Sequence, residues 1–373
     1  MNTGGEKTGM RSVFQNQKLE RWIEKLMLLF LVITISAASF EGFFSKWSFR
    51  DDAHSFGIER MLEGTADRPY VYRRLLPEAA KAIVSSMPTE AKDKLEKKLS
   101  TQRPAEDVYA RSIPPASYRI EYYLLMAFCY LFLVASVYLY RSIFSEITKD
   151  SVAGTLTAFL FALIFPYLEV LGGYYYDIPE IFFFGLAVRC AMNGRIVPFL
   201  FLSIIATLNK EAFFFFLLTM FPFFRLRYGT KKAACVVAAS IVLSGIFYAM
   251  LSGMYVQNPG ERAQFHFIDH IVDFVHLNSY LVTSTTYGLP LASGFFVTHV
   301  LYVIWIAWMG WQYLPDVWKT QTKLAALVNV PLYLLFANPG EVRNLSLLYV
   351  SFFVMLAYWL HHLLRTAYDG MKK

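Results

Sequence analysis

Charged side chains are scarce in this chain. Asp, Glu, Lys and Arg make up 17% of the 373 residues, whereas 56% are hydrophobic. An ordinary soluble domain carries about 25% charged residues, and several apolar runs here reach the ~20 residues that a helix needs to cross a bilayer. The scarcity of charge therefore excludes an ordinary soluble domain. We expect one integral membrane domain over residues 1–373, built as an all-α, polytopic transmembrane helical bundle.

Cysteine is also rare, and its placement forms no motif. Cys129, Cys190 and Cys235 all fall inside apolar runs, so they suggest neither a disulfide framework nor a metal-ligand spacing. The sequence also lacks internal repeats and low-complexity segments. The first apolar run follows a polar stretch and has no small-residue cleavage site, which indicates a retained membrane anchor and not a signal peptide.

The basic residues predict the topology. The net charge of +7 comes from Lys and Arg that cluster at the ends of apolar segments, where they orient a membrane protein. This placement argues against nucleic acid as a partner. Alternating basic ends predict about 10 membrane segments, including short broken helices, with both termini in the cytoplasm. The expected host, a plasma or inner membrane, does not follow from this pattern. A long first external loop then spans residues 45–118, with amphipathic surface helices, and a second one spans residues 256–289.

One apolar run needs a special assignment. Residues 196–224 are too long for one span and have basic residues at both ends. A hairpin of two short helices, broken at Asn209-Lys210-Glu211, satisfies the charge pattern. A single tilted span is the alternative, and it would invert the topology of everything that follows.

Local patterns predict smaller elements. In the first loop, the spacing predicts a short helix that stops at Gly64, a restart led by Pro69, and surface helices over residues 72–87 and 89–99. Nearer the C-terminus, a short apolar segment is expected over residues 324–336.

The first loop holds an acidic pair and a basic pair. Asp51 and Asp52 directly follow the first apolar segment, and Arg73 and Arg74 stand in the phrase RPYVYRRLLP. Paired acids can act as a general base or bind a cation, and paired arginines suit an anionic phosphate. A solvated, salt-bridged loop is the alternative interpretation.

Three further motifs place charged residues at the ends of short or broken apolar segments. They are LGGYYYDIPE, NKE and NPGEVRN. The predicted topology puts them on the same external face as the first loop, and ionisable groups at membrane depth usually mark a pathway or a site. We therefore expect one external cavity that gathers Asp51, Asp52, Arg73, Arg74, Asp177, Glu180, Lys210, Glu211, Glu341 and Arg343.

Each of these motifs also has a purely structural interpretation. Asp177 can cap the helix that follows it. Lys210 and Glu211 can neutralise each other in a buried turn. Glu341 and Arg343 can form an ordinary turn at the membrane interface.

Aromatic residues and histidines add two further candidates. Tyr176 belongs to a run of three tyrosines that can stack on a sugar ring, although tyrosines are common at membrane boundaries. His266, His270 and His276 include the i, i+4 spacing of metal ligands. However, aspartates stand between them on an amphipathic helix, so we expect a wet surface there and assign no metal site.

The arrangement resembles the GT-C superfamily of integral membrane glycosyltransferases. The resemblance lies in one cytoplasmic-to-external helix followed at once by an acidic pair, here Arg50-Asp51-Asp52, and in a long first external loop containing RPYVYRRLLP. Later external acids beside an aromatic cluster, as in YYYDIPE, and a basic-acidic break, as in NKE, are also similar. The overlap covers about the first two-thirds of the chain.

The resemblance implies an inverting glycosyl transfer on the external face, from a polyprenyl-phosphate sugar donor to a glycan, lipid or protein acceptor. An acid of the first external loop, Asp51 or Asp52, would take the proton of the acceptor hydroxyl. Asp177 and Glu180 would hold sugar hydroxyls, or a divalent cation if one is used, and no other cofactor is expected. The cations that would stabilise the leaving phosphate are Arg73, Arg74, Lys210 and Arg343.

Three other classes remain open. A lipid-linked glycan polymerase or ligase relies mainly on arginines to hold pyrophosphate, and it would stay active without Asp51 and Asp52. A transporter or flippase usually shows internal repeats and charges near the middle of the membrane. A membrane acyltransferase would need a buried catalytic histidine.

Overall fold

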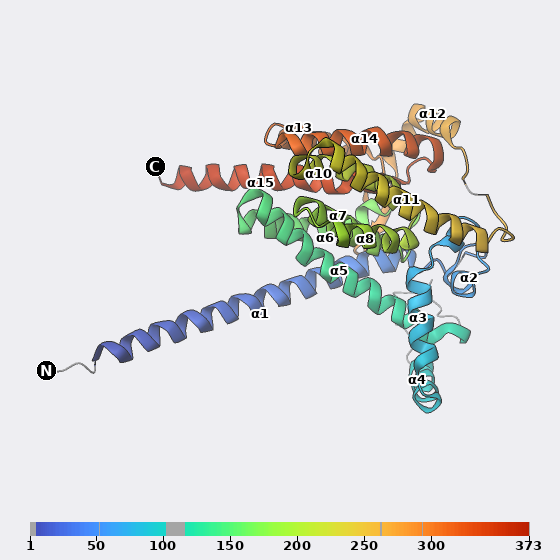
Figure 1. Cartoon of the computed structure of the whole chain (residues 1–373), viewed down its shortest axis with the longest axis horizontal. Helices are drawn as coiled ribbons and strands as arrows, with labels where there is room; N and C mark the ends of the chain where they lie inside the picture. Colours follow the sequence, from blue (N-terminus) through green and yellow to red (C-terminus); the bar gives the residue numbers. More distant parts are fainter. Residues whose placement is uncertain (1–4, 52, 102–115, 262, 293, 373) are drawn as a thin grey trace.

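The computed structural model describes residues 5–51, 53–101, 116–261, 263–292 and 294–372, without the side chains of residues 5–18 and 116. Helices make up most of these residues, which confirms the all-α prediction (Figure 1). The α-helices are α1 (Gly5–Trp47), α2 (Ile58–Glu63), α3 (Leu75–Ser86), α4 (Thr89–Thr101), α5 (Arg119–Thr148), α6 (Ser151–Leu168), α7 (Asp177–Met192), α8 (Ile196–Asn209), α9 (Phe213–Phe216), α10 (Phe221–Tyr228), α11 (Thr230–Met254), α12 (Phe267–Val275), α13 (Val297–Trp311), α14 (Asp316–Phe336) and α15 (Tyr349–Met371). Short 3₁₀ helices are η1 (Tyr70–Tyr72), η2 (Ala116–Tyr118), η3 (Leu217–Met220), η4 (Leu277–Leu281) and η5 (Val342–Leu348), and the two strands are β1 (Thr283–Thr286) and β2 (Leu289–Ala292).

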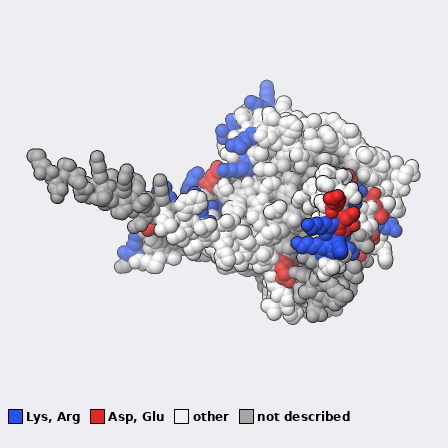
Figure 2. All heavy atoms as spheres, turned by 90° about the horizontal axis from the view of Figure 1, so that it is seen from below, with Lys and Arg blue, Asp and Glu red and all other residues white. Residues whose placement is uncertain are grey.

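Five helices of the described chain are long and apolar enough to cross a membrane, which supports a membrane-embedded, multi-pass protein. This number is smaller than the roughly ten segments predicted, because several apolar runs form shorter helices, among them α8 and α13. In Figure 2, a broad surface without charged side chains separates Lys and Arg at one end of the bundle from mixed acids and bases at the other. The candidate spans are Leu19–Trp47, Arg119–Thr148, Ser151–Leu168, Thr230–Met254 and Val342–Met371.

The helices pack side by side, and the N-terminal part of α1 projects away from the bundle (Figure 1). The other part of α1 packs on α5 and α6, while α8 and α10 pack on α11, and α13 packs on α15. Large aromatic rings fill the core between helices, as where Tyr140 of α5 meets Phe161 of α6 with ring centroids 4.4 Å apart. Such buried rings contribute much of the packing energy, because each removes a large apolar area from solvent.

The predicted break in the long apolar run is confirmed. Helix α8 ends at Asn209, and Lys210 adopts an extended backbone with φ −158° and ψ 128°. The chain then continues through the short helices α9, η3 and α10. A buried lysine needs partners of opposite charge. Because the backbone is extended at Lys210, its side chain points away from α8 toward such partners.

The first loop has the predicted order of elements. Helix α2 is followed by Gly64 in the left-handed region (φ 81°), and η1 follows Pro69. Helices α3 and α4 correspond to the two predicted surface helices. However, the apolar residues Leu76 and Ala80 of α3 are buried in the protein core and do not form a free membrane-facing surface, because α3 packs on α5. Residues 102–115 of this loop lie outside the described residues.

The second loop contains a β-hairpin that the sequence did not predict. Strands β1 and β2 pair antiparallel around Tyr287 and Gly288, which both have positive φ values of 55° and 73°, as a two-residue hairpin turn requires. The Tyr287 hydroxyl donates to the Leu163 carbonyl of α6 at 2.8 Å. The hairpin therefore contacts the helical bundle. Helix α13 begins after the hairpin, at Val297.

Helix α14 corrects the short segment predicted over residues 324–336. It begins at Asp316, directly after Pro315, and therefore includes Lys319 and Lys323. The prediction followed hydropathy, which ends a segment where polar residues begin. Polar residues are nevertheless compatible with a helix, and the helix begins after Pro315, whose backbone is extended with φ −61° and ψ 152°.

Candidate functional site

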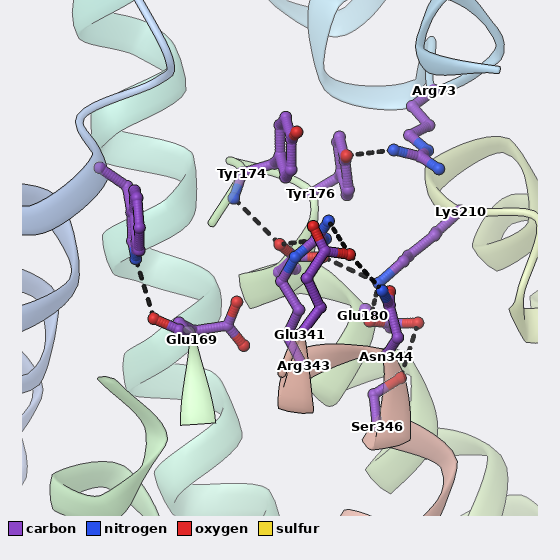
Figure 3. Close-up of polar contacts among 12 residues, drawn as sticks. Arg73, Glu169, Tyr174, Tyr176, Glu180, Lys210, Glu341, Arg343, Asn344 and Ser346 are labelled. Carbon is purple, nitrogen blue, oxygen red and sulfur yellow. Dashed lines mark hydrogen bonds and ion pairs between the residues drawn. The ribbon is translucent and has the colours of Figure 1, made fainter. Parts of the chain in front are cut away.

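Several chain segments bring charged residues together at the end of the bundle opposite the two termini (Figure 1). The C-terminal ends of α6 and α8 meet the N-terminal end of α7, the connection between α14 and α15, and the η1 turn of the first loop. Figure 3 shows their side chains pointing toward one another. The convergence inferred from the topology is therefore present for the residues Arg73, Asp177, Glu180, Lys210, Glu211, Glu341 and Arg343.

Lys210 lies at the centre of this cluster. Its Nζ donates to Asp177 Oδ1 at 2.8 Å and to Glu180 Oε2 at 2.7 Å, and all three side chains are buried. Ser346 of η5 donates to the other Glu180 oxygen at 3.2 Å. Lys210 thus pairs with acids of α7 and not with its neighbour Glu211, so the interpretation as a self-neutralising turn is wrong.

Asp177 connects the cluster to the tyrosine run. It is the first residue of α7, and its Oδ2 accepts a hydrogen bond from the Tyr174 backbone N–H at 2.9 Å. The N-cap position of α7 is therefore Tyr176, whose side chain makes no capping hydrogen bond. Asn209 Nδ2 donates to the Tyr176 carbonyl at 2.8 Å. These bonds hold the three tyrosines against the broken end of α8.

Arg73 forms a two-pronged ion pair with Glu211. Its Nε and Nη2 donate to the two carboxylate oxygens at 3.1 and 2.6 Å, and its Nη1 donates to the Tyr176 hydroxyl. Burial by itself would raise the pKa of Glu211, but the adjacent Arg73 lowers it below its ordinary value. Burial lowers the pKa of Arg73, whereas Glu211 raises it, and the result lies well above its ordinary value. Both groups are therefore charged at neutral pH.

Arg343 is the least well paired cation of the cluster. Its contacts with Asp177 and Glu341 are long, at 3.5 Å each, and its Nε finds no acceptor within the part of the chain that the structure describes. The side chain is only 6% exposed. A buried guanidinium with an unused donor is costly, so Arg343 is suited to accept a further anionic ligand.

Stacked aromatic rings support the two arginines. The rings of Tyr174 and Tyr176 lie 5.0 Å apart with an angle of 9° between their planes. Arg73 lies over Tyr176 at 4.2 Å, and Arg343 lies over Tyr174 at 4.7 Å. Arg50, which was not a predicted site residue, lies over Tyr174 at 5.6 Å. The tyrosine run is therefore buried and forms cation–π contacts inside the protein.

A cavity of about 570 Å³ opens beside this cluster. One part of its wall is charged, with Arg73, Lys210, Glu211, Glu341 and Arg343. The chain after Pro259 contributes another part, including His266. The remaining wall is mainly apolar, and its residues come from the α9 region, α11 and α14: Phe214, Phe215, Tyr248, Leu332 and Phe336.

Asp51 and Arg74 are not part of the cavity lining. Asp51 accepts a hydrogen bond from the Tyr122 hydroxyl of α5 at 2.8 Å, and Asp52 lies outside the described residues. Arg74 donates to the Met61 carbonyl and pairs with Glu78 of α3. The two adjacent arginines therefore differ, since Arg73 lines the cavity while Arg74 ties the first loop together.

Glu169 is a buried acid near the cluster that the sequence interpretation missed. It directly follows α6, is 1% exposed, and has one carboxylate oxygen without a hydrogen-bond partner in the described chain. Burial, and next the negative charge of Asp177, raise the pKa of Glu169 well above its ordinary value. The signal that marked the other motifs, an acid at the end of an apolar run, is present here and could have identified it.

Of the three histidines, His276 is exposed, as a wet surface requires, whereas His270 is not. His270 is buried, its Nε2 lies 2.9 Å from the Ala337 carbonyl, and its ring contacts Tyr333, so the prediction of a wet surface is wrong for this residue. His266 does pair with Asp269, at 2.9 Å. Within the described ranges, no three His, Cys, Asp or Glu side chains are grouped as metal ligands.

A scan against protein-family models and searches of curated proteins and of solved structures found no match to this chain. The chemistry of the cavity must therefore indicate its ligand. Buried cations at one wall can hold an anionic group through charge-assisted hydrogen bonds, and the apolar wall can hold a hydrocarbon chain. The cavity is thus suited to an amphiphile with a negatively charged head.

Proposed function

We propose that this protein is a GT-C-like membrane glycosyltransferase that uses a polyprenyl-phosphate sugar donor. The observation that carries the proposal is the cavity in which buried cations face an apolar wall, because a lipid-linked phosphate needs both surfaces. The acceptor hydroxyl attacks the anomeric carbon with inversion, the bond from that carbon to the phosphate oxygen breaks, and polyprenyl phosphate leaves. The acceptor is a glycan, a lipid or a protein.

The cavity residues have distinct roles in this proposal. Arg343, whose donors are least used, binds the donor phosphate together with Arg73 and Lys210. These cations stabilise the negative charge that develops on the phosphate as it leaves. Glu211 and Glu341 line the cavity and hold sugar hydroxyls. Asp177 and Glu180 act through Lys210, which they fix in place.

The general base in this proposal is the acidic pair Asp51 and Asp52. A base needs hydrogen-bond reach to the acceptor hydroxyl, and Asp51 instead contacts Tyr122. The acceptor would therefore approach along the first loop. An arginine-containing cavity whose lining omits Asp51 also favours a second candidate function, a lipid-linked glycan polymerase or ligase.

The proposal includes an arrangement in the membrane. In addition to the five candidate spans, the helices α7, α8, α10, α13 and α14 cross or enter the bilayer, which gives about ten segments. Both termini are cytoplasmic, and the cavity opens toward the external face of a plasma or inner membrane.

The first experiment is mass spectrometry of the lipids that co-purify with the protein in nanodiscs. A retained polyprenyl phosphate or polyprenyl-phosphate sugar is the expected result. A polyprenyl-pyrophosphate oligosaccharide would instead favour the polymerase or ligase. Bulk phospholipid alone, in a protein with an intact fold, would contradict both candidates.

The same experiment on Arg343→Gln tests the cavity directly. We expect the amount of retained lipid phosphate to fall by about tenfold or more, because one charge-assisted contact contributes roughly 1.5–3 kcal/mol. Arg189→Gln is the matched control, since Arg189 forms an ion pair with Glu146 away from the cavity. Equal retention in both variants would exclude Arg343 from the binding site.

The double variant Asp51→Asn with Asp52→Asn tests the base. Loss of a general base costs about 100-fold or more in rate, so transfer should be nearly abolished while lipid retention persists. Tyr122→Phe removes the hydrogen bond to Asp51 but keeps both carboxylates, and it separates a structural effect from a chemical one. Full transfer activity in a folded double variant would rule out the base assignment and favour the polymerase or ligase.

A further inference from the structure

Helix α12 presents a continuous apolar stripe that no described part of the chain covers. Ile268, Ile271, Val272 and Val275 recur at positions i, i+3, i+4 and i+7, so they share one face of the helix. Between 48% and 77% of each residue is exposed. Leu277, two residues after the end of the helix, is 80% exposed. A run of this kind is unusual on a surface that faces water.

The other faces of α12 contact the protein itself. His270 is buried against the Ala337 carbonyl, and the His266 backbone N–H donates to the Leu335 carbonyl of α14 at 2.9 Å. Asp269 pairs with His266, and the Asp273 carboxylate accepts a hydrogen bond from Ser279 at 2.7 Å. The polar groups are thus held on the sides away from the stripe, and the helix is anchored to the end of α14 with the stripe pointing outward.

We propose that α12 is an interfacial helix whose stripe is immersed in the lipid of the membrane. Helix α13 also exposes apolar residues, namely Leu301, Ile304 and Trp308, and it packs on the apolar helix α15. The Phe274 ring of α12 lies 5.7 Å from the ring of Phe295, two residues before α13 begins, so α12 lies close to the start of a second helix that exposes apolar residues. An amphipathic helix with one such face lies in the plane of the interface, with the apolar side chains among the acyl chains.

The charge pattern indicates which feature of the lipid binds the helix. From Ala263 to Trp318 the sequence contains no Lys or Arg, so attraction to anionic headgroups does not hold α12 at the membrane. Burial of the apolar stripe holds it there instead. The interaction should therefore depend little on the content of anionic lipid or on ionic strength.

The position of α12 bears on the cavity. Residues Ala263, Gln264 and His266, which lead into the helix, line the cavity wall. Immersion of α12 therefore places this wall near the level of the headgroups. If the proposed function holds, a lipid-linked donor can then present its phosphate to the cavity while its chain stays in the bilayer.

Fluorescence quenching by lipids tests this inference. Val275→Cys and, as the control on another face of the helix, Asp269→Cys are each labelled with the environment-sensitive fluorophore NBD in a protein whose three native cysteines are replaced. Each labelled protein is reconstituted as one copy per nanodisc, with or without lipids brominated in their acyl chains. We expect blue-shifted emission and loss of intensity with brominated lipids at position 275, and water-like, unquenched emission at position 269.

Two outcomes would overturn the inference. Water-like emission at both positions would place the stripe in solvent. Blue-shifted emission at position 275 without quenching would place the stripe against protein, as in contact with an unlabelled partner. The fluorescence measurement requires no sugar donor. A result that contradicts the lipid position of α12 would therefore leave the proposed function intact. Evidence against the proposed function would likewise leave the position of α12 unaffected.

Discussion

Lys210 shows how this bundle accommodates a charge at depth. The ammonium group is buried with two carboxylates at 2.8 and 2.7 Å, and Arg343 lies near the same Asp177. Removing one partner from a buried ion pair leaves an uncompensated charge, which costs about 3–5 kcal/mol. Variants of Asp177 or Glu180 will therefore combine loss of stability with any loss of function. Arg343 is a better probe of binding, because its own ion pairs are long.

Glu169 allows a prediction for stability as a function of pH. Burial raises its pKa in the folded protein, whereas the pKa of a glutamate in an unfolded chain is about 4.3. Above that pH the unfolded chain releases this proton and the folded protein retains it, so the free energy of unfolding falls as the pH rises toward the folded pKa. Glu169→Gln cannot ionise, and it should lose this part of the pH dependence.

Thermal unfolding in detergent between about pH 5 and pH 8 measures this effect. The stability of the Gln variant relative to the original protein should increase toward the higher pH. Glu63→Gln, at an exposed position of α2, serves as the control. Parallel stability curves for Glu169→Gln and the original protein would contradict the assignment of a raised pKa.

At the scale of single elements, the start of α6 depends on Asp150. Its Oδ1 accepts hydrogen bonds from the backbone N–H groups of Val152 and Ala153 at 2.9 and 3.0 Å, and its Oδ2 lies 3.0 Å from His361 of α15. Asp150→Ala should lower the free energy of unfolding by about 1 kcal/mol, because two helix N–H groups lose their acceptor. Thermal unfolding checks this value.

Asp150→Asn separates the two contacts of this residue. Asparagine is an equally good N-cap but carries no charge to pair with His361. We expect the Asn variant to retain most of the stability that the Ala variant loses. A loss of the same size in both variants would show that the contact with α15, and not the cap, is the stabilising interaction.

At the scale of the whole molecule, the orientation of the second loop distinguishes the two interpretations of the 196–224 run. With the hairpin topology, Asn278→Cys lies outside and Lys231→Cys lies inside the cell; both positions are exposed on the protein surface. In a background without native cysteines, an impermeant thiol reagent should label position 278 in intact cells and position 231 only after permeabilisation. The reverse pattern would support the single tilted span.

Local physics explains which parts of the architecture could be predicted. The helix stop at Gly64 and the break after Asn209 were both predicted from the sequence. Glycine tolerates positive φ, and the apolar run 196–224 is too long for one span and has basic residues at both ends. The β-hairpin and the early start of α14 were missed. A hydropathy average detects only the apolar part of a helix. It therefore missed the polar first turns of α14, which begins at Asp316.

The sequence by itself determined that the protein is helical and membrane-embedded, and it identified most of the ionisable residues that form the cluster. Scarce charge and long apolar runs require helices in a membrane, since backbone groups in lipid must be hydrogen-bonded within the segment. The few ionisable groups at the ends of those runs were identified because each of them is costly to bury. Most of them meet in one cluster.

Only the tertiary structure decided how these residues pair. Arg73 and its partner Glu211 are 138 positions apart in the sequence, and Lys210 and Asp177 are 33 positions apart. Such pairings depend on how the helices dock. The same docking separates Arg74 from Arg73, places Glu169 beside the cluster and buries His270. The sequence pattern of a helix specifies which of its sides is apolar. It does not specify which other helix packs against that side, because this depends on the packing of the whole bundle.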